Sequence, residues 1–356
     1  MKYRIIALAL ITLLNAAHVS AASAQTPSAP GEKQKIIVAY VTSRQDPLPD
    51  PTYVTHINYA FGHVNTTFDG VKIENPRLLK KISKLKRKYP HLKVMLSIGG
   101  WGSGRFSEMA ADSLKRAAFA KDCRRKVRRF RLDGIDIDWE YPGSSVAGIS
   151  SSPEDTRNYT LMMRDIRAAI GPDKILSQAT VCEAKFIDFK AVDQYVDYTS
   201  AMTYDLGWAP YLNSPLFPSE LLQPDSMSAS QGIESHLAAG VPRDKLLLGL
   251  AFYGRGVKGF PRKTDLEKAH TLEGYDYHWD RNAMNPYLTD SATGEFAFGY
   301  ENSTSLSIKV RYAIDQGLLG VMYWQYGGDN EAGDLRRTVY ETLFPAECSV
   351  HTAGRK

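Results

Sequence analysis

The stretch that decides the fold reads Leu132-Asp133-Gly134-Ile135-Asp136-Ile137-Asp138-Trp139-Glu140-Tyr141-Pro142-Gly143. Successive side chains of a β-strand point to opposite faces, so this stretch predicts a strand with two unlike faces. One face carries Ile135, Ile137 and Trp139, and the other carries Asp136, Asp138 and Glu140. Pro142 and Gly143 then end the strand.

The three acids follow one another on a single face, with no basic residue between them. Neighbours on one face of a strand lie roughly 6.5–7 Å apart, so like charges in such a row repel one another. A strand face that is merely solvated usually mixes residue types. Crowded carboxylates raise the proton affinity of at least one member, which a general acid working near neutral pH requires. The row therefore indicates either acid chemistry or a cation site with oxygen ligands.

Short apolar runs alternate with longer amphipathic segments from Lys35 onward. The strand-like runs are Ile36–Val41, His56–Val64, Lys93–Ile98, Leu132–Glu140, Ile175–Val181, Tyr195–Tyr204, Lys245–Tyr253 and Gly320–Tyr326. The helix-like segments are Pro76–Tyr89, Ser113–Phe130, Pro153–Ile170, Phe186–Val192, Ser226–Ala239, Ser303–Gln316 and Ala332–Leu343. This alternation indicates an α/β protein with a parallel sheet. Eight such units predict a closed (β/α)8 TIM barrel, with an open doubly wound sheet as the alternative.

Barrel enzymes carry their chemistry in the loops at the C-terminal ends of the strands. In this chain those ends hold aromatic residues and acids: Tyr40, Phe61, Ser97 to Trp101, Glu140-Tyr141, Met202 to Asp205, Phe252 to Arg255 and Tyr323 to Gln325. Aromatic side chains at strand ends can simply cover the barrel. As a set with acids among them they predict a sugar site, because pyranose rings stack on aromatic faces while sugar hydroxyls take polar partners.

The composition is that of a globular protein with a sizeable core, since 43% of the 356 residues are hydrophobic. Residues 1–24 combine Lys2 and Arg4, an apolar run and small residues ending at Ala24, which predicts a secretory signal peptide cleaved near Ala24. Its removal takes away two positive charges and no acid, so the net charge falls from +5 to +3. We therefore expect a secreted or periplasmic protein with no nucleic-acid partner and no membrane anchor.

The three cysteines, Cys123, Cys182 and Cys348, are odd in number, so a disulfide framework cannot hold this fold together. At most one bridge forms, and the sequence does not say which. No cluster of cysteine and histidine has the spacing of metal ligands. We expect no metal and no cofactor.

Three motifs together resemble one known family. Asp133 to Glu140 resembles the D-G-x-D-x-D-x-E signature of the family 18 glycoside hydrolases, the retaining chitinases. Ser97-Ile98-Gly99-Gly100 resembles that family's third-strand S-x-G-G motif, and Met202-Thr203-Tyr204-Asp205 resembles its sixth-strand M-T-Y-D motif. The motifs stand in family order, and the resemblance covers nearly all of Lys35 to Phe344. It implies a catalytic barrel over residues 35–345, after a flexible leader at 25–34 and before a C-terminal tail at 346–356.

The resemblance implies a substrate-assisted retaining mechanism, an exception to the usual pair of enzyme carboxylates. Glu140 would protonate the glycosidic oxygen while the 2-acetamido carbonyl of the sugar in subsite −1 attacks the anomeric carbon, which gives an oxazolinium ion. Glu140 would then activate water. Asp138 would accept a hydrogen bond from the acetamido N–H, and Asp136 would support Asp138 by sharing a proton with it. The Tyr204 hydroxyl would donate to the acetamido oxygen.

The resemblance also implies a set of substrate-binding residues. Trp324 would floor subsite −1, Asp205 would hold nearby sugar hydroxyls, and Trp101 and Trp208 would stack on the leaving-group side. The other cleft residues that we expect are Tyr40, Phe61, Gly100, Tyr141, Met202, Tyr253 and Arg255.

We therefore expect a monomeric, endo-acting hydrolase of β-1,4 bonds between N-acetylglucosamine units in chitin or chitooligosaccharides. One alternative is an endo-β-N-acetylglucosaminidase that cuts the chitobiose core of N-glycans. Another is a chitin-binding, chitinase-like lectin on the same barrel, although such lectins usually lack the acid that Glu140 supplies.

Many family members carry an α+β insertion after the seventh strand, which deepens the cleft. Only a short segment separates Arg255 from Tyr275 here, so we expect this insertion to be absent or reduced. The segment Gly256 to Asn302 is still long for a βα loop and should hold structure of its own. Its aromatic residues, Tyr275, Tyr277, Trp279 and Tyr287, either wall the cleft or pack within the segment.

Overall fold

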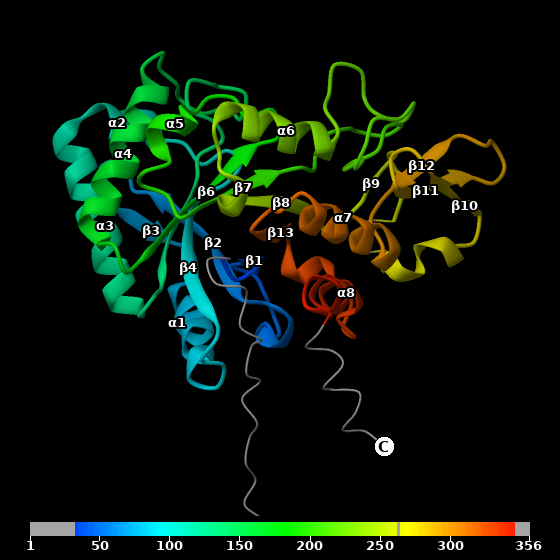
Figure 1. Cartoon of the computed structure of the whole chain (residues 1–356), viewed down its shortest axis with the longest axis horizontal. Helices are drawn as coiled ribbons and strands as arrows, with labels where there is room; N and C mark the ends of the chain where they lie inside the picture. Colours follow the sequence, from blue (N-terminus) through cyan, green and yellow to red (C-terminus); the bar gives the residue numbers. More distant parts are fainter. Residues whose placement is uncertain (1–32, 262–263, 346–356) are drawn as a thin grey trace, which may run out of the picture.

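Eight parallel strands form a closed barrel in the computed structural model, which describes residues 33–261 and 264–345 (Figure 1). The strands are β1 (Ile36–Thr42), β2 (His56–Val64), β4 (Lys93–Gly99), β5 (Gly134–Asp138), β6 (Ile175–Val181), β7 (Tyr198–Met202), β8 (Leu246–Ala251) and β13 (Gly320–Trp324). β1 pairs with β2 on one side and with β13 on the other, which closes the ring. The predicted (β/α)8 barrel is confirmed, and the open doubly wound sheet is wrong.

Helices surround this barrel. They are α1 (Pro76–Lys84), α2 (Phe106–Ala111), α3 (Ser113–Phe130), α4 (Asp155–Ile170), α5 (Phe189–Val192), α6 (Ala229–Ala239), α7 (Ser303–Asp315) and α8 (Asp334–Leu343). Short 3-10 helices lie at η1 (Pro51–Tyr53), η2 (Leu85–Arg87), η3 (Arg243–Lys245), η4 (Leu266–Thr271) and η5 (Tyr326–Gly328). Seven helices were predicted at these places, whereas α2 and the short strand β3 (Val71–Ile73), which pairs antiparallel with β2, were not.

Several of the helices begin where a side chain caps their free backbone N–H groups. Asp112 accepts from the amides of Leu114 and Lys115 at the start of α3. Capping boxes begin two others, with Ser228 and Gln231 at α6 and Asn302 and Ser305 at α7. These local signals explain why several predicted helix starts agree with the structure to within three residues.

The core has two layers, one outside the strands and one inside the barrel. Outside, Ile135, Ile137 and Trp139 of the deciding stretch are all buried against the helices, as the alternation predicted. Inside, apolar residues such as Val38, Met95, Leu247 and Met322 fill part of the barrel. A set of polar side chains fills another part, and each of them is fully buried: Asn58, Ser97, Asp136, Ser177 and Ser200. Barrel interiors are usually filled by branched apolar residues, so this polar layer is unusual and leads to the site.

The segment after β8 forms a second, smaller sheet beside the barrel (Figure 1). Its antiparallel strands are β9 (Arg255–Gly256), β10 (Tyr275–Asp280), β11 (Asn285–Asp290) and β12 (Phe296–Gly299), in the order β10-β11-β12-β9. The segment thus holds a small insertion, which agrees with the expectation of an absent or reduced one. A tight connection, Arg281–Met284, lets β10 and β11 pair as a hairpin, so a small sheet needs few residues.

Three further expectations concern the two ends of the chain, the cysteines and the absence of a membrane anchor. The predicted signal peptide, leader and C-terminal tail lie outside the described residues. Cys123 and Cys182 are free and buried, and Cys348 is outside the described residues. Within residues 33–261 and 264–345, no helix is both long and apolar enough to cross a membrane.

Candidate active site

The acidic face of β5 rises from the centre of the barrel to its mouth. Asp136 is 0% exposed and Asp138 is 4% exposed, whereas Glu140, just beyond the strand, is half-buried. The strand alternation therefore delivers three carboxylates at three depths. Asp136 is too deep to contact a ligand, whereas Glu140 lines the cavity and can contact one.

Asp136 is held by hydroxyl groups from three other strands. The Tyr40 and Ser97 hydroxyls donate to its Oδ2 at 2.8 and 2.7 Å, and the Ser177 hydroxyl donates to its Oδ1 at 2.6 Å. Burial raises the pKa of Asp136, and the hydrogen bonds from Ser177, Ser97 and Tyr40 oppose that rise. Asp136 is thus a buried acid with enough donors to carry a negative charge.

Asp138 and Glu140 bind protons more tightly than free carboxyls. Burial raises the pKa of Asp138 well above its usual value, and the charges of Glu140 and then Asp136 add to the rise. Burial also raises the pKa of Glu140 to about 7, with Tyr141 acting against the rise and Asp205 adding to it. Asp138 Oδ1 is buried and has no hydrogen-bond partner within the described residues. Glu140 is therefore suited to donate a proton near neutral pH, and Asp138 has a free acceptor.

A cavity of about 440 Å³ lies over these acids. Ten of the predicted site residues line it: Tyr40, Phe61, Trp101, Asp138, Glu140, Tyr141, Met202, Tyr204, Asp205 and Trp324. Seven residues that were not predicted also line it: Ala179, Val181, Cys182, Glu183, Leu206, Ser226 and Met227. Most of these seven are small or apolar and lie within β6 or in the loops after β6 and β7, so no chemical signal in the sequence marked them.

Tyr204 presents its hydroxyl at this cavity with little to hold it. Within the described residues its hydrogen bond is a long contact to the Met322 thioether sulfur, at 3.8 Å. Thioether sulfur is a weak acceptor, so the Tyr204 hydroxyl remains available to donate to a bound molecule. Burial and nearby acids raise its pKa well above the usual value, which keeps the hydroxyl protonated.

A second cavity, of about 960 Å³, adjoins the first at Trp324, which lines both. Trp208, Tyr253 and Arg255 line this second cavity, not the first. Arg255 lies 3.9 Å above the Trp208 ring and also contacts Asp205, whose Oδ1 accepts from the Arg255 side chain and from the Tyr253 hydroxyl at 2.7 Å. The structure therefore places Trp208 and Trp101 in different cavities.

Aromatic rings surround the acids on two sides. Trp324 stacks on Phe61, with ring centroids 5.6 Å apart, and lies 5.8 Å from Tyr40. On the other side the Tyr141 ring meets the edge of Trp101 at 6.3 Å and stacks on Phe186 at 5.4 Å. Phe186 was not predicted as a site residue, because it was expected to begin a helix. It lies instead in the loop after β6 with a left-handed backbone.

Gly100 lies behind the cavity, where a larger residue would not fit. Its N–H donates to the Asp138 carbonyl at 2.8 Å, and a Cβ atom on it would lie 2.6 Å from the Phe61 ring. Its φ of +90° also favours glycine. Gly100 thus lets the end of β4 approach β5 and Phe61 closely, and it supports the cavity wall from behind.

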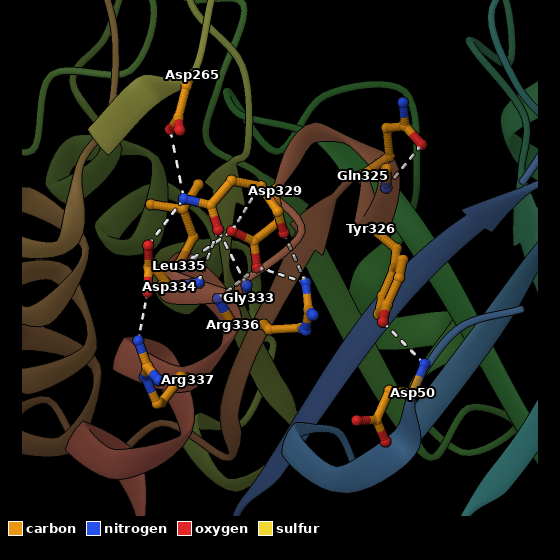
Figure 2. Close-up of polar contacts among 12 residues, drawn as sticks. Asp50, Asp265, Gln325, Tyr326, Asp329, Gly333, Asp334, Leu335, Arg336 and Arg337 are labelled. Carbon is orange, nitrogen blue, oxygen red and sulfur yellow. Dashed lines mark hydrogen bonds and ion pairs between the residues drawn. The ribbon is translucent and has the colours of Figure 1, made fainter. Parts of the chain in front are cut away.

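The loop that carries Trp324 away from the barrel is fixed by polar contacts to α8 (Figure 2). The buried Asp329 carboxylate accepts from the amides of Leu335 and Arg336 at 3.1 Å and from the Arg336 guanidinium at 2.9 Å. At the near end of the same loop, the Tyr326 hydroxyl accepts from the Asp50 amide at 2.8 Å. The loop that follows Trp324 is therefore tied to both α8 and the β1–β2 connection.

The same cluster reaches the small sheet. The Asn330 side-chain amide donates to Asp334 Oδ2 at 2.8 Å and to Asp265 Oδ1 at 3.4 Å. In Figure 2, Asp265 comes down on this cluster from the segment that leads into the small sheet. The second cavity thus lies between two segments that share a polar contact.

No metal site accompanies these acids in the described ranges, 33–261 and 264–345. No group of three or more His, Cys, Asp or Glu side chains there is arranged to hold a metal ion. The arrangement is instead that of a proton donor, a free buried acceptor and stacked aromatic rings at the C-terminal end of a parallel barrel. Fold and site together define a barrel protein of the glycoside hydrolase class.

Comparisons with known proteins identify the family. The pattern of the glycosyl hydrolases family 18 matches residues 36–329. The chain belongs to this family, as the sequence motifs predicted. It is 30% identical to Chitinase A1 of Niallia circulans, covering 79% of this chain but only 53% of that protein, and 29% identical to Probable chitinase 2 of Drosophila melanogaster, covering 85% and 74%.

Solved structures agree with the fold. A family 18 N-acetylglucosaminidase from Paenibacillus barengoltzii is 30% identical and superimposes with a TM-score of 0.78, covering 87% of this chain and all of that one. The chitinase domain of the spore coat protein CotE from Clostridium difficile is 32% identical, with a TM-score of 0.63 over 92% of this chain and 96% of that one.

Proposed function

We propose that this chain hydrolyses internal β-1,4 bonds between N-acetylglucosamine units of chitin or chitooligosaccharides, with retention of configuration. The observation that carries the proposal is the Asp138 carboxylate, which lies in one cavity with Glu140 and Tyr204 and whose buried Oδ1 has no hydrogen-bond partner among residues 33–261 and 264–345. An acetamido group has one N–H donor and one carbonyl acceptor. Asp138 offers the acceptor and Tyr204 the donor, so the site matches that group in both respects.

The proposed reaction has two steps. Glu140 gives its proton to the glycosidic oxygen, the bond from that oxygen to the anomeric carbon breaks, and the acetamido carbonyl oxygen bonds to the same carbon. Water then attacks the anomeric carbon of this oxazolinium ion, the bond from the acetamido oxygen to that carbon breaks and restores the acetamido group, and Glu140 takes a proton from the water. Asp138 accepts from the acetamido N–H and stabilises the positive charge that develops on the group. Asp136, with its three hydroxyl donors, stays ionised most easily when the proton of the pair is on Asp138.

Binding is proposed to rest on the rings and the Asp205 cluster. Trp324 supports the sugar in subsite −1, and Trp101 with Tyr141 receives the leaving group, because Glu140 lies on their side of the cavity. Asp205, oriented by Tyr253 and Arg255, takes sugar hydroxyls at the junction of the two cavities. Stacking of a pyranose ring on these aromatic faces gives affinity without fixing chain length.

Glu140→Gln tests the proposal. We expect the folded variant to lose about a thousandfold or more of its activity on chitotetraose, since it cannot donate the proton. Glu154→Gln, an exposed acid before α4, is the matched control and should keep normal turnover. Near-normal hydrolysis by Glu140→Gln would contradict the assignment. The first product of the wild type should be the β-anomer, and EDTA should not change the rate.

A product profile separates the related activities. The solved relative from Paenibacillus barengoltzii is an N-acetylglucosaminidase, so release of single sugars alone would argue for that activity. Release of a whole glycan from an N-glycopeptide would argue for an endo-β-N-acetylglucosaminidase. Binding of chitin with no turnover would argue for a lectin. We expect short oligomers from a long chitooligosaccharide.

We also propose that residues 1–24 direct export and are removed, which leaves a monomer that begins at Gln25. Sequencing the N-terminus of the exported protein tests this. An exported protein that still carries Lys2 and Arg4 would contradict it.

A further inference from the structure

A fully buried ion pair lies between α7 and the small sheet, outside both cavities. The Lys309 ammonium, whose side chain is 1% exposed, contacts Glu301, whose side chain is 0% exposed. Glu301 also accepts from the Ser305 hydroxyl at 2.6 Å, the Asn285 amide at 2.9 Å and the Ser214 hydroxyl at 2.5 Å. Three further side chains thus converge on one buried charge pair.

The cluster joins three segments that are far apart in the sequence. Lys309 and Ser305 belong to α7, Asn285 begins β11, and Ser214 belongs to the loop after β7. Lys309 also donates to the Ser214 backbone carbonyl. Two residues farther on, the Leu216 amide donates to the Ala283 carbonyl at 2.9 Å, so backbone and side chains fix the same junction.

The loop that this cluster holds leads directly to the site. Asn213, next to Ser214, accepts from the Asp205 amide on its side-chain oxygen at 3.1 Å, and its backbone carbonyl accepts from the Leu206 amide at 2.9 Å. Asp205 has a φ of +58°, a left-handed conformation that non-glycine residues rarely adopt without support. The two hydrogen bonds that Asn213 accepts stabilise this backbone conformation of Asp205.

A buried ion pair is not needed for stability alone. Two charges lose their hydration on burial, and a well-packed apolar pair of similar volume is often as stable. Here the cation has a second partner, the Ser214 carbonyl, whose position an apolar side chain could not set. Hydrogen bonds are directional, so Lys309 and Glu301 can hold the Ser214 backbone in one place. This indicates that the pair serves to position the loop after β7.

We propose that Lys309 and Glu301 are positioning residues that fix the loop after β7, and through Asn213 the backbone of Asp205, in the geometry that binds substrate. The proposal deepens the proposed function and rests on it, because Asp205, Tyr253 and Arg255 are expected to hold sugar hydroxyls. Loss of the pair should therefore weaken substrate binding more than the proton transfer by Glu140.

The test removes both charges together, in Lys309→Met with Glu301→Gln, so that no charge is left buried without its partner. We expect a folded protein whose KM for chitotetraose rises roughly fivefold to tenfold while kcat changes less than about threefold, the size of a typical coupling through such a network. Hydrogen exchange of the amides in 205–216 should become faster. KM and loop exchange both within twofold of the wild type would overturn the proposal.

Two further variants keep the test decisive. Lys245→Met with Asp193→Asn removes an ion pair just before β8, away from the site, and should leave KM and loop exchange unchanged. Asn213→Ala removes the side-chain hydrogen bond to the Asp205 amide and leaves both charges in place. It should therefore raise KM by a similar factor, and the triple variant should raise it no further. An unchanged KM in Asn213→Ala would overturn the proposal, even if the charge variant fails to fold.

The exchange measurement also separates this proposal from the proposed function. A wild type with no activity on chitin oligomers would contradict the function. Faster exchange at 205–216 in the charge variant, against no change in the control pair, would still support the positioning role. Unchanged exchange with an active wild type would overturn the positioning role alone.

Discussion

At the scale of single residues, the raised pKa of Glu140 sets the pH range of the proposed reaction. Burial brings this pKa to about 7, so Glu140 holds its proton below pH 7 and loses it above. A general acid works only when protonated. We therefore expect kcat/KM on chitotetraose to fall about tenfold for each pH unit above roughly 7. A pH–rate profile measures this, and a level profile up to pH 9 would rule out Glu140 as the acid that limits the rate.

Ser177 should affect the pKa values of Asp136 and Asp138 through its hydrogen bond to Asp136. Its hydroxyl donates to Asp136 Oδ1 at 2.6 Å, and its loss would leave a buried carboxylate oxygen without a partner. Ser177→Ala should therefore raise the pKa of Asp136 further and move the acid limb of the kcat/KM profile to higher pH, with kcat lower by about tenfold.

Ser200 provides a matched control inside the same barrel. Its hydroxyl is fully buried and has no hydrogen-bond partner within the described residues, so Ser200→Ala should leave the profile unchanged. If the two alanine variants gave the same profile, the Ser177 hydrogen bond would have no special effect on Asp136.

The location of single site residues could be predicted where strand alternation or a sequence motif indicated it. The burial of Asp136 and Asp138 and the gathering of Tyr204, Asp205 and Trp324 around one cavity agree with the sequence. Ser177 and Phe186 could not be found in this way. A serine in a strand that also carries Gln178 and Thr180 looks ordinary, as does an aromatic residue near a helix, and only the closed barrel brings Ser177 and Phe186 to the site.

At the scale of elements, α8 should depend on one buried carboxylate. Asp329 accepts from two amides at the start of α8 and from Arg336, and its side chain is 0% exposed. Asp329→Asn leaves the Arg336 charge without its partner. We expect a loss of about 3 kcal/mol in the free energy of unfolding, with a raised KM because the loop after Trp324 loosens.

The same helix supplies the control for this prediction. Arg337 and Asp334 form an ion pair whose side chains are 43% and 30% exposed, so Arg337→Gln should cost less than about 1 kcal/mol. Figure 2 shows the Arg337–Asp334 pair on α8 and the contact of Arg336 with Asp329 in the loop before that helix. Equal losses in denaturant unfolding of the two variants would contradict the special role of Asp329.

Elements with a strong period were predictable, and elements that depend on context were not. The seven helices and eight barrel strands followed from their apolar repeats and caps, whereas α2 is six residues long and offers too short a period to recognise. The strands of the small sheet could not be predicted one by one, because β10 and β11 are rich in polar residues and show no clear apolar repeat. Tyr287 packs against His278 and Phe296 within the sheet, at 5.0 and 5.8 Å. None of its four predicted aromatic residues lines either cavity.

At the scale of the whole molecule, the two ends of the described chain complete the barrel together. β1 pairs with β13, Ile36 opposite Gly320, so the ring closes only when the last strand has been added. The Tyr53 ring then meets Tyr340 of α8 at 5.6 Å, and the Tyr326 hydroxyl binds the Asp50 amide. The eight units predicted that the ring closes, but local periods do not report which side chains of α8 and of the β1–β2 connection meet at the closure.

This closure predicts which part of the chain is sufficient. A protein of residues 33–345 contains every strand of the ring and α8, so we expect it to unfold in a single transition and to keep kcat/KM on chitotetraose within about twofold of the full chain. A protein of residues 33–331 keeps all eight strands but lacks α8, and it leaves Asp329 without Arg336 and Tyr53 without Tyr340. We expect that shorter protein to lose its cooperative transition and its activity. Thermal unfolding and hydrolysis of the two proteins measure this, and an active, cooperatively folded 33–331 would show that the barrel closes without the helix.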